Sequence, residues 1–229
     1  MEEKMINQVT AGNCFLCGGE LTKIKMKNHV LKSHLSEQKG EKVLLIKVEG
    51  AYQKEYWLLL DIALNAALVN LDDFLRQIWL ECCGHMSGFY PPADNFGRDE
   101  FDMKTKIKTL AQGKKLLYRY DFGTTTTLMV TVLDSGIRPP QKDAVRLLAR
   151  NVPRDIACVK CGKPAECFCP ICDCEHGRET AWYCEKCYEI HDCPDREYTL
   201  PITNSPRTCT CGYDGGLDTW KFDPVKIKR

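Results

Sequence analysis

Residues 158–193 read CVKCGKPAECFCPICDCEHGRETAWYCEKCYEIHDC, and this segment contains three C-x2-C pairs followed by a histidine and one more cysteine. The eight candidate ligands are Cys158, Cys161, Cys169, Cys172, Cys184, Cys187, His191 and Cys193. A structural zinc ion takes four thiolate or imidazole ligands at the corners of a tetrahedron. The segment is therefore predicted to hold two zinc ions, and to depend on them for folding because it has few core residues.

The order of the pairs resembles cross-brace modules of the MYND, ZZ and B-box type, in which the first and third pairs share a metal ion. On that model one site consists of Cys158, Cys161, Cys184 and Cys187, and the other of Cys169, Cys172, His191 and either Cys193 or Cys211. Sequential pairing would use the same residues. The excess of cysteine ligands predicts closed structural sites, because a catalytic zinc keeps an open position and a nearby carboxylate base.

Composition sets the expected class and compartment of the protein. The chain has 229 residues, with 32 Lys and Arg against 31 Asp and Glu, a formal charge of +1 and 15 cysteines. Near-neutral charge argues against a globally basic nucleic-acid binder, and a hydrophobic fraction of 44% argues against disorder. Residues 1–13 lack the apolar core of a signal peptide, and the most apolar stretch, residues 56–71, is too short and polar to span a bilayer. A cytoplasmic protein is expected, without membrane association, whose cysteines bind zinc.

The first forty residues carry a separate ligand pattern, C-x2-C-x11-H-x4-H, formed by Cys14, Cys17, His29 and His34. The pattern resembles a two-Cys, two-His zinc finger that is one residue short of the usual central spacing. Two histidines about one helical turn apart can present their nitrogens to the same ion. Leu21 and Met26 fall where such fingers keep their small apolar core.

The helix expected in this finger, residues 23–34, carries candidate nucleic-acid contacts. These are Lys23, Lys25, Asn28 and Lys32. A single finger reads only about 3 bp, so a structural or protein-contacting finger is favoured. The lysines keep contact with phosphates open as an alternative, together with the lysines at 104–108 and 114–115 and the tail KFDPVKIKR.

The middle of the chain has the pattern of an α+β domain. The expected strands are residues 42–50, 55–63, 114–123, 124–136 and 145–150, because apolar and β-branched residues recur in each. A helix is expected over 70–83, with Asn70, Asp72 or Asp73 capping it. A short basic helix is expected over 102–113, and a hairpin around Gly123.

Residues 71–90, LDDFLRQIWLECCGHMSGFY, and 109–133, TLAQGKKLLYRYDFGTTTTLMVTVL, resemble the plasmid ORF-3-like family, also described as TnpR-like passenger proteins of insertion elements. The residues that match its YDFG core are Tyr118, Tyr120, Asp121, Phe122 and Gly123, whereas Thr124, Thr125 and Thr127 replace the following Asp, Trp and His of many members. Residues 147–151, 200–207 and 211–213 look like a zinc-bearing branch. The resemblance implies a prokaryotic protein with an antiparallel sheet packed by helices, and no established reaction.

Cys82, Cys83 and His85 end the expected helix. They could form a metal site, a thiol site or a nucleophile pair, but residues at the end of an apolar helix more often pack in a core, and no orienting partner for a nucleophile is recognisable. Packing is therefore the expected role. Cys167, Cys174 and Cys209 are expected to be spare thiols or alternates.

These features predict an α+β fold with an antiparallel sheet packed by helices, flanked by an N-terminal zinc finger and a C-terminal double-zinc, cross-brace-like module. The expected segments are a finger at 1–40, the plasmid ORF-3-like domain at 41–153, the zinc module at 154–215 and a basic tail at 216–229. About three structural zinc ions per chain are expected from the four-ligand rule.

The expected function is non-enzymatic recognition, with a link to mobile genetic elements through the family. A protein partner is favoured over nucleic acid, and no small-molecule substrate is inferred. Two alternatives remain open at this point. One is a DNA-binding regulator that uses the finger and the lysine clusters, and the other is an enzyme that uses Cys82, Cys83 and His85.

Overall fold

The computed structural model describes residues 10–93, 99–176, 180–193, 198–216 and 221–224. The chain forms two compact units. Unit 1 consists of residues 1–75, 86–152 and 220–229, and unit 2 consists of residues 76–85 and 153–219. The chain therefore leaves unit 1 for ten residues after Leu75 before it returns at Met86. Of the basic tail expected at 216–229, only Gly216 and residues 221–224 lie within the described parts.

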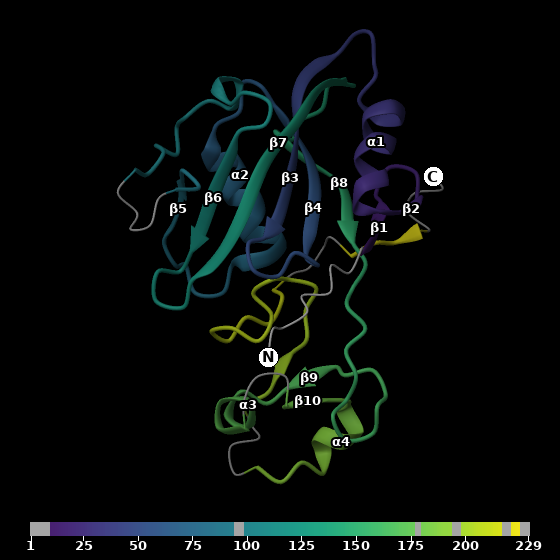
Figure 1. Cartoon of the computed structure of the whole chain (residues 1–229), viewed down its shortest axis with the longest axis vertical. Helices are drawn as coiled ribbons and strands as arrows, with labels where there is room; N and C mark the ends of the chain where they lie inside the picture. The colour runs from purple at the N-terminus through teal and green to yellow at the C-terminus, as the bar shows by residue number, and fades with distance from the viewer. Residues whose placement is uncertain (1–9, 94–98, 177–179, 194–197, 217–220, 225–229) are drawn as a thin grey trace. The chain divides into compact units, whose positions relative to one another are not determined.

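Unit 1 contains an eight-stranded sheet in the order β2-β1-β8-β4-β3-β7-β6-β5, and all neighbouring strands run antiparallel (Figure 1). The strands are β1 (Ala11–Cys14), β2 (Glu20–Thr22), β3 (Glu41–Gly50), β4 (Trp57–Ala63), β5 (Ser87–Tyr90), β6 (Lys115–Tyr120), β7 (Thr126–Arg138) and β8 (Val145–Asn151). The prediction of a mixed α and β fold with a large antiparallel sheet is confirmed. Each of the five expected strands corresponds to one strand of this sheet.

Burial along the strands follows from their place in the sheet. β4 is buried at all its positions, as expected of a central strand that is covered on both faces. β6 instead alternates between buried and more accessible residues, which is the pattern of a strand with one covered face. The β6–β7 hairpin turns at Asp121, whose φ is 63° and whose Oδ1 accepts hydrogen bonds from the N–H groups of Gly123 (3.0 Å) and Thr124 (3.2 Å).

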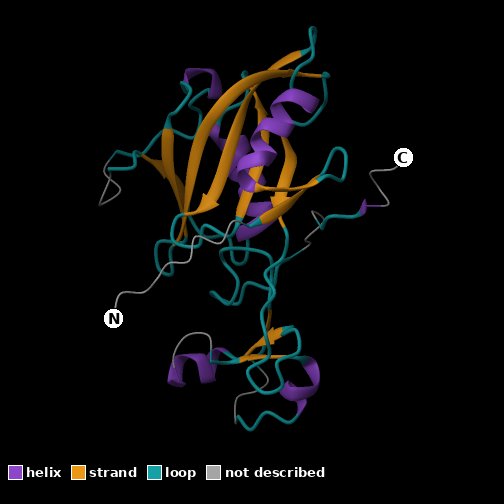
Figure 2. Ribbon diagram, turned by 45° about the vertical axis from the view of Figure 1, so that its right-hand side comes forward, coloured by secondary structure: helices purple, strands orange, loops and turns teal. Residues whose placement is uncertain are grey.

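Two helices, α1 (Lys23–His34) and α2 (Leu68–Leu75), contact β8 and lie along the sheet (Figure 2). The expected helix over 70–83 is interrupted, because α2 gives way to the π-helical turn η1 (Arg76–Leu80). The expected cap at Asp72 is wrong. Asp72 lies inside α2, is buried, and accepts hydrogen bonds from the hydroxyls of Ser87 and Tyr118 at 2.6 Å each. Asp73 lies beside it in the same helix and is exposed.

The basic helix expected over 102–113 is also wrong. Within the described residues the only helical element of this segment is the short 3-10 turn η2 (Ile107–Thr109). Part of its backbone bonds to a distant segment: Ile107 N–H donates to Ala66 O (3.0 Å), and Thr105 O accepts from Leu68 N–H (3.0 Å). The local bonds of Thr105, Thr109 and Leu110 N–H reach back only three residues, as in turns and not as in an α-helix. These tertiary hydrogen bonds replace the ones that a helix would have made.

The N-terminal segment is joined to the main sheet, although the sequence suggested a boundary after residue 40. β1 pairs with β8, and Met26 and Val30 of α1 share one buried core with Trp57 of β4. A Cβ atom at Gly12 of β1 would collide with the Trp57 ring, so this close approach requires glycine. The first forty residues therefore obtain much of their stability from the hydrophobic core of unit 1.

A buried ion cluster fixes the register of the central strands. Asp61 of β4 and Arg138 of β7 are both fully buried, and Arg138 Nη1 donates to Asp61 Oδ1. Asp61 Oδ2 accepts from Arg146 Nε of β8 (2.8 Å), and Arg138 also donates through Nη2 to Glu41 Oε2 of β3 (2.7 Å). A slip of one residue would leave buried charges unpaired, so the cluster selects a single register.

Unit 2 has far less secondary structure. It contains α3 (Pro170–His176), α4 (Glu185–Glu189) and a three-stranded sheet in the order β10-β9-β11, with β9 at Cys167–Phe168, β10 at Trp182–Tyr183 and β11 at Leu200–Pro201. Its buried cluster mixes cysteines with a few apolar residues, among them Ile156, Phe168 and Trp182. In the parts of the chain that are described, no helix has the length and apolar character needed to cross a membrane.

We predict that Asp61→Asn lowers the free energy of unfolding of unit 1 by about 3 kcal/mol, because Arg138 and Arg146 lose their shared counter-ion. Urea denaturation with zinc present measures the change. The matched control is Asp134→Asn on β7, whose Oδ1 accepts a hydrogen bond from Ser135 N–H, and it is expected to cost less than about 1 kcal/mol. Equal effects of the two substitutions would contradict a role for the buried cluster.

Candidate metal centres

The described residues contain four groups of Cys and His side chains whose ligand atoms all lie within 4.8 Å of one another, and each group could hold a metal ion. Site A consists of Cys14, Cys17, His29 and His34; site B of Cys158, Cys161, Cys184 and Cys187; site C of Cys169, Cys172, His191 and Cys193; and site D of Cys82, Cys83, His85 and Cys211. None of the fifteen cysteines forms a disulfide. Site A belongs to unit 1, and sites B, C and D belong to unit 2.

Site A brings β1, the loop after it and α1 together. Cys17 Sγ lies 3.2 Å from His29 Nε2, and Cys14 Sγ lies 3.5 Å from His34 Nε2. Ligands on one tetrahedral zinc, with Zn–S near 2.3 Å and Zn–N near 2.0 Å, stand about 3.5 Å apart. Burial lowers the pKa of His34, which favours the neutral imidazole that binds metals.

The candidate nucleic-acid residues of α1 divide into two groups. Lys23 Nζ donates to Glu49 Oε2 (2.9 Å) and to Lys54 O (2.8 Å), so its charge is used inside unit 1. Lys25, Asn28 and Lys32 are exposed. The structure therefore leaves three of the four candidates accessible to a phosphate or to another ligand.

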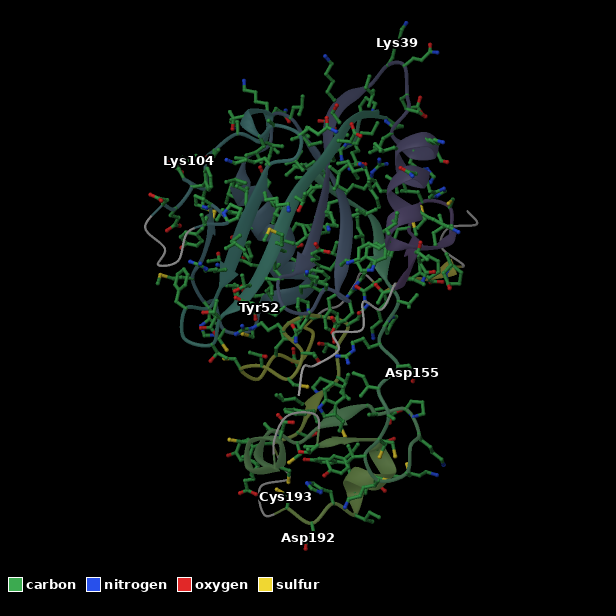
Figure 3. The ribbon with its side chains drawn as sticks, in the orientation of Figure 1. Lys39, Tyr52, Lys104, Asp155, Asp192 and Cys193 are labelled. Atoms are coloured by element: carbon green, nitrogen blue, oxygen red, sulfur yellow. The ribbon has the colours of Figure 1, made fainter. Side chains whose placement is uncertain are left out.

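Sites B and C interleave along the chain, because the first and third C-x2-C pairs form site B, while the second pair joins His191 and Cys193 in site C. This grouping corresponds to the cross-brace alternative, not to sequential pairing. The structure places Cys193 in site C, whereas Cys211, the other candidate for that position, lies in site D. Asp192 is exposed, and its side chain points outward beside Cys193 (Figure 3).

The distances in sites B and C match thiolates that share an ion. Cys161 Sγ lies 3.7 Å from Cys184 Sγ, and Cys169 Sγ lies 3.9 Å from Cys193 Sγ. A disulfide would bring the sulfurs to about 2.0 Å, whereas two thiolates on one tetrahedral zinc stand about 3.8 Å apart. In site C, Cys172 Sγ lies 3.2 Å from the imidazole Nε2 of the histidine ligand.

Two of the C-x2-C pairs share one backbone turn. The N–H of Cys14 donates to Gly19 O (2.8 Å) and Cys14 O accepts from Gly18 N–H (2.9 Å). In the same way, Cys158 N–H donates to Lys163 O (2.7 Å), and Cys158 O accepts from Gly162 N–H (2.9 Å). The glycine that follows the second cysteine has a φ of 78° in the first turn and 71° in the second, in the left-handed region that glycine occupies without strain.

The other two pairs begin short helices. Cys184 O accepts a hydrogen bond from Tyr188 N–H (3.0 Å) at the start of α4, and Cys169 O accepts one from Asp173 N–H (3.1 Å) at the start of α3. The two cysteines of a pair then lie within one turn, with their sulfurs on the same side. The geometry of each C-x2-C pair is therefore set locally, by the backbone of three to five residues.

Electrostatics within sites B and C favour the binding of a cation. In site B, burial alone would raise the pKa of Cys158, but the backbone hydrogen bonds of Cys184, Lys160 and Cys161 lower it to about 6. Hydrogen bonds with Cys161 and Cys184 raise the pKa of Cys187 to about 12. In site C, burial and the neighbouring thiols raise the pKa of Cys172 to about 12. Crowded thiols cannot all ionise together unless a positive ion lies among them.

Site D was missed by the sequence reasoning, which expected Cys82, Cys83 and His85 to be packing residues. That expectation is wrong for Cys83, which is exposed. The fourth member, Cys211, is 126 residues away from His85, and the two ligand atoms lie 3.5 Å apart. The shared signal in the sequence was the dipeptide Cys-Gly, which occurs at 83–84 and 211–212 as it does at 17–18 and 161–162.

Comparisons with known proteins assign no function to the chain. No family model matches the sequence, and no curated protein is significantly similar to it. A crystal structure of a protein of unknown function from Methanosarcina mazei Go1 aligns with a TM-score of 0.41 and 19% sequence identity, over 52% of this chain and 75% of that chain. The metal centres therefore carry the functional argument.

We predict that Gly18→Ala weakens zinc binding at site A about fivefold, because alanine in the left-handed region costs about 1 kcal/mol. Competition with a chelator of known affinity measures the change. The control is Gly19→Ala, since Gly19 is not in that region and Lys163 occupies the equivalent position of the other turn. A similar loss in both variants would show that the glycine conformation does not matter for binding.

Proposed function

We propose that the protein is a zinc-dependent, non-enzymatic recognition protein that binds another protein through unit 2. The observation that carries this proposal is the interleaving of sites B and C. Each site supplies four ligands, which is the full coordination of a structural zinc and leaves no position for a reacting water. Thiolate and imidazole ligands favour zinc over hard cations such as magnesium or calcium. Zinc in sites A, B and C then serves to fold a surface.

The metal ions are most important in unit 2. Its described strands are two residues long, and its buried cluster is built largely around the ligands themselves. A structural zinc supplies on the order of 10 kcal/mol of folding free energy in small domains. Zinc in sites B and C would therefore replace the hydrophobic core that unit 2 lacks.

The surface beside these sites favours a protein partner. A cleft of about 670 Å³ lies against ligands of both sites, Cys172, Cys187 and His191. Two apolar side chains in its lining reach solvent, since Ile190 is 83% exposed and Val159 is 45% exposed. Exposed apolar residues gathered around a hollow are typical of surfaces that bind other proteins. The lining also includes Lys160 and Asp192, so charges of both signs are available at its edge.

Affinity purification with tagged variants from the native cell tests this proposal. A specific protein is expected to be enriched by the wild type and lost at least tenfold with Ile190→Glu, because the charge would be placed at the apolar contact. Tyr52→Glu is the matched control, since Tyr52 is 86% exposed in unit 1 (Figure 3).

Equal enrichment with Ile190→Glu, or no enriched protein at all, would contradict the proposal. Recovery of nucleic acid instead, lost at moderate salt and with Lys25→Glu and Lys32→Glu, would favour the DNA-binding alternative.

We also predict that a strong zinc chelator unfolds unit 2 and leaves the sheet of unit 1 folded. Hydrogen exchange followed by mass spectrometry should show residues 153–216 losing protection, while β3, β4 and β7 keep theirs. The helix α1 should loosen only in part, because Met26 and Val30 remain in the hydrophobic core. Re-addition of zinc is the control. Full protection of 153–216 in excess chelator would refute metal-dependent folding.

A further inference from the structure

Site D has the number and the kinds of ligands that a tetrahedral zinc site requires. Its four ligand atoms lie within 4.8 Å of one another, as in the other three groups. Cys211 Sγ and His85 Nε2 are 3.5 Å apart, the separation expected when a sulfur and a nitrogen share one zinc ion. Three of the four side chains come from one short loop and the fourth from a distant loop of the same unit.

The loop that carries Cys82, Cys83 and His85 is held by a network of polar contacts. Arg76 Nη1 pairs with Glu81 Oε2 (2.8 Å), and Arg76 Nη2 donates to His85 O (2.7 Å). Glu81 Oε1 accepts a hydrogen bond from Gly84 N–H at 2.6 Å. The side chain of Arg76 therefore spans both ends of the loop and holds the backbone that carries the three ligands.

The loop that carries Cys211 is fastened to the same part of unit 2. Trp79 Nε1 donates to Asn204 O (3.0 Å), and Ser205 Oγ donates to Trp79 O (2.7 Å). The backbone then makes successive turns, with Thr208 N–H bonded to Ser205 O and Tyr213 N–H bonded to Thr210 O. These bonds bring Cys211 beside the loop that follows η1.

The backbone of site D shares one feature with sites A and B. A cysteine ligand is followed by a left-handed glycine at Gly84 (φ 72°) and at Gly212 (φ 66°), as at Gly18 and Gly162. Each of the four Cys-Gly dipeptides in the sequence therefore supplies a ligand of one of the four groups. Cys211 itself has a φ of 50°. A non-glycine residue in this region is strained, and such strain is concentrated at functional sites.

A positively charged side chain, that of Arg207, lies beside the ligand set and can balance its charge. Three thiolates and a neutral imidazole around one divalent ion leave one net negative charge. Arg207, whose side chain is buried, places Nη2 3.5 Å from Cys82 Sγ. A guanidinium hydrogen-bonded to a ligand sulfur stabilises the thiolate form and offsets the remaining charge.

From these observations we propose that Cys82, Cys83, His85 and Cys211 form a fourth zinc site, with Arg207 as the residue that balances its charge. The site differs from sites B and C in exposure, because Cys83 and Cys211 are both exposed. A zinc ion in this site would cross-link residues 76–85 to the loop at 204–213, both of which belong to unit 2. It is also the ion that a chelator reaches most readily. This proposal stands independently of the recognition function.

Metal content of the full-length, untagged, zinc-loaded protein provides the first test. Elemental analysis should give about four zinc ions per chain. The variants Cys83→Ser, Cys211→Ser and His85→Ala should each bind one zinc ion fewer, whereas His85→Cys should keep all of them. Cys174→Ser is the matched control, because Cys174 is exposed and belongs to none of the four groups. About three zinc ions in the wild type, unchanged in Cys211→Ser, would overturn the proposal and leave sites A, B and C intact.

Alkylation of the wild-type thiols tests the site without any variant. In zinc-loaded protein, Cys83 and Cys211 should react with iodoacetamide at least tenfold more slowly than Cys174, although all three are exposed. A brief treatment with chelator should raise their rates to that of Cys174. Rates equal to that of Cys174 before chelation would overturn the proposal. Protection that only a reductant removes would also overturn it, since it would indicate a disulfide.

Discussion

The folding of unit 2 depends on clusters of thiols, because the ligand atoms of each site lie within 4.8 Å of one another. Ionised sulfurs repel each other, and protonated ones that are buried gain little from contact with one another. The pKa of Cys158 is lowered to about 6, while that of Cys187 in the same site is raised to about 12. A divalent cation that draws all four ligands to one point would stabilise such a set as a whole. The small strands and helices of unit 2 are arranged around this requirement.

Unit 1 is stabilised in a different way. Its sheet has eight strands, its central strand β4 is buried throughout, and the ion cluster around Asp61 fixes the pairing of neighbouring strands. Site A is part of this unit, because Met26 and Val30 pack with Trp57. A metal ion in site A would therefore add to a core that already exists, whereas metal ions in sites B and C would take the place of one.

The two kinds of stabilisation bear on the proposed function. A domain that folds around metal ions can leave apolar side chains such as Ile190 and Val159 in contact with solvent, because they are not needed for its core. Residues released from the core are available for a partner. The same property would make the proposed recognition surface depend on the metal, so that loss of the metal would remove the surface and leave the sheet of unit 1 in place.

Sequence by itself determined the strands β3, β4, β6, β7 and β8 of unit 1. It also determined the candidate ligands of sites A, B and C, apart from the choice between Cys193 and Cys211, since a C-x2-C pair closes within one turn and needs no distant residue. Only the tertiary structure decided that Asp72 accepts hydrogen bonds from Ser87 and Tyr118 instead of capping α2, and that β1 joins the main sheet. The tertiary structure also decided that Cys211 belongs to site D and not to site C. The hydrogen bonds of Trp79 to the loop around Ser205 bring together ligands 126 residues apart, and local spacing contains no information about such a contact.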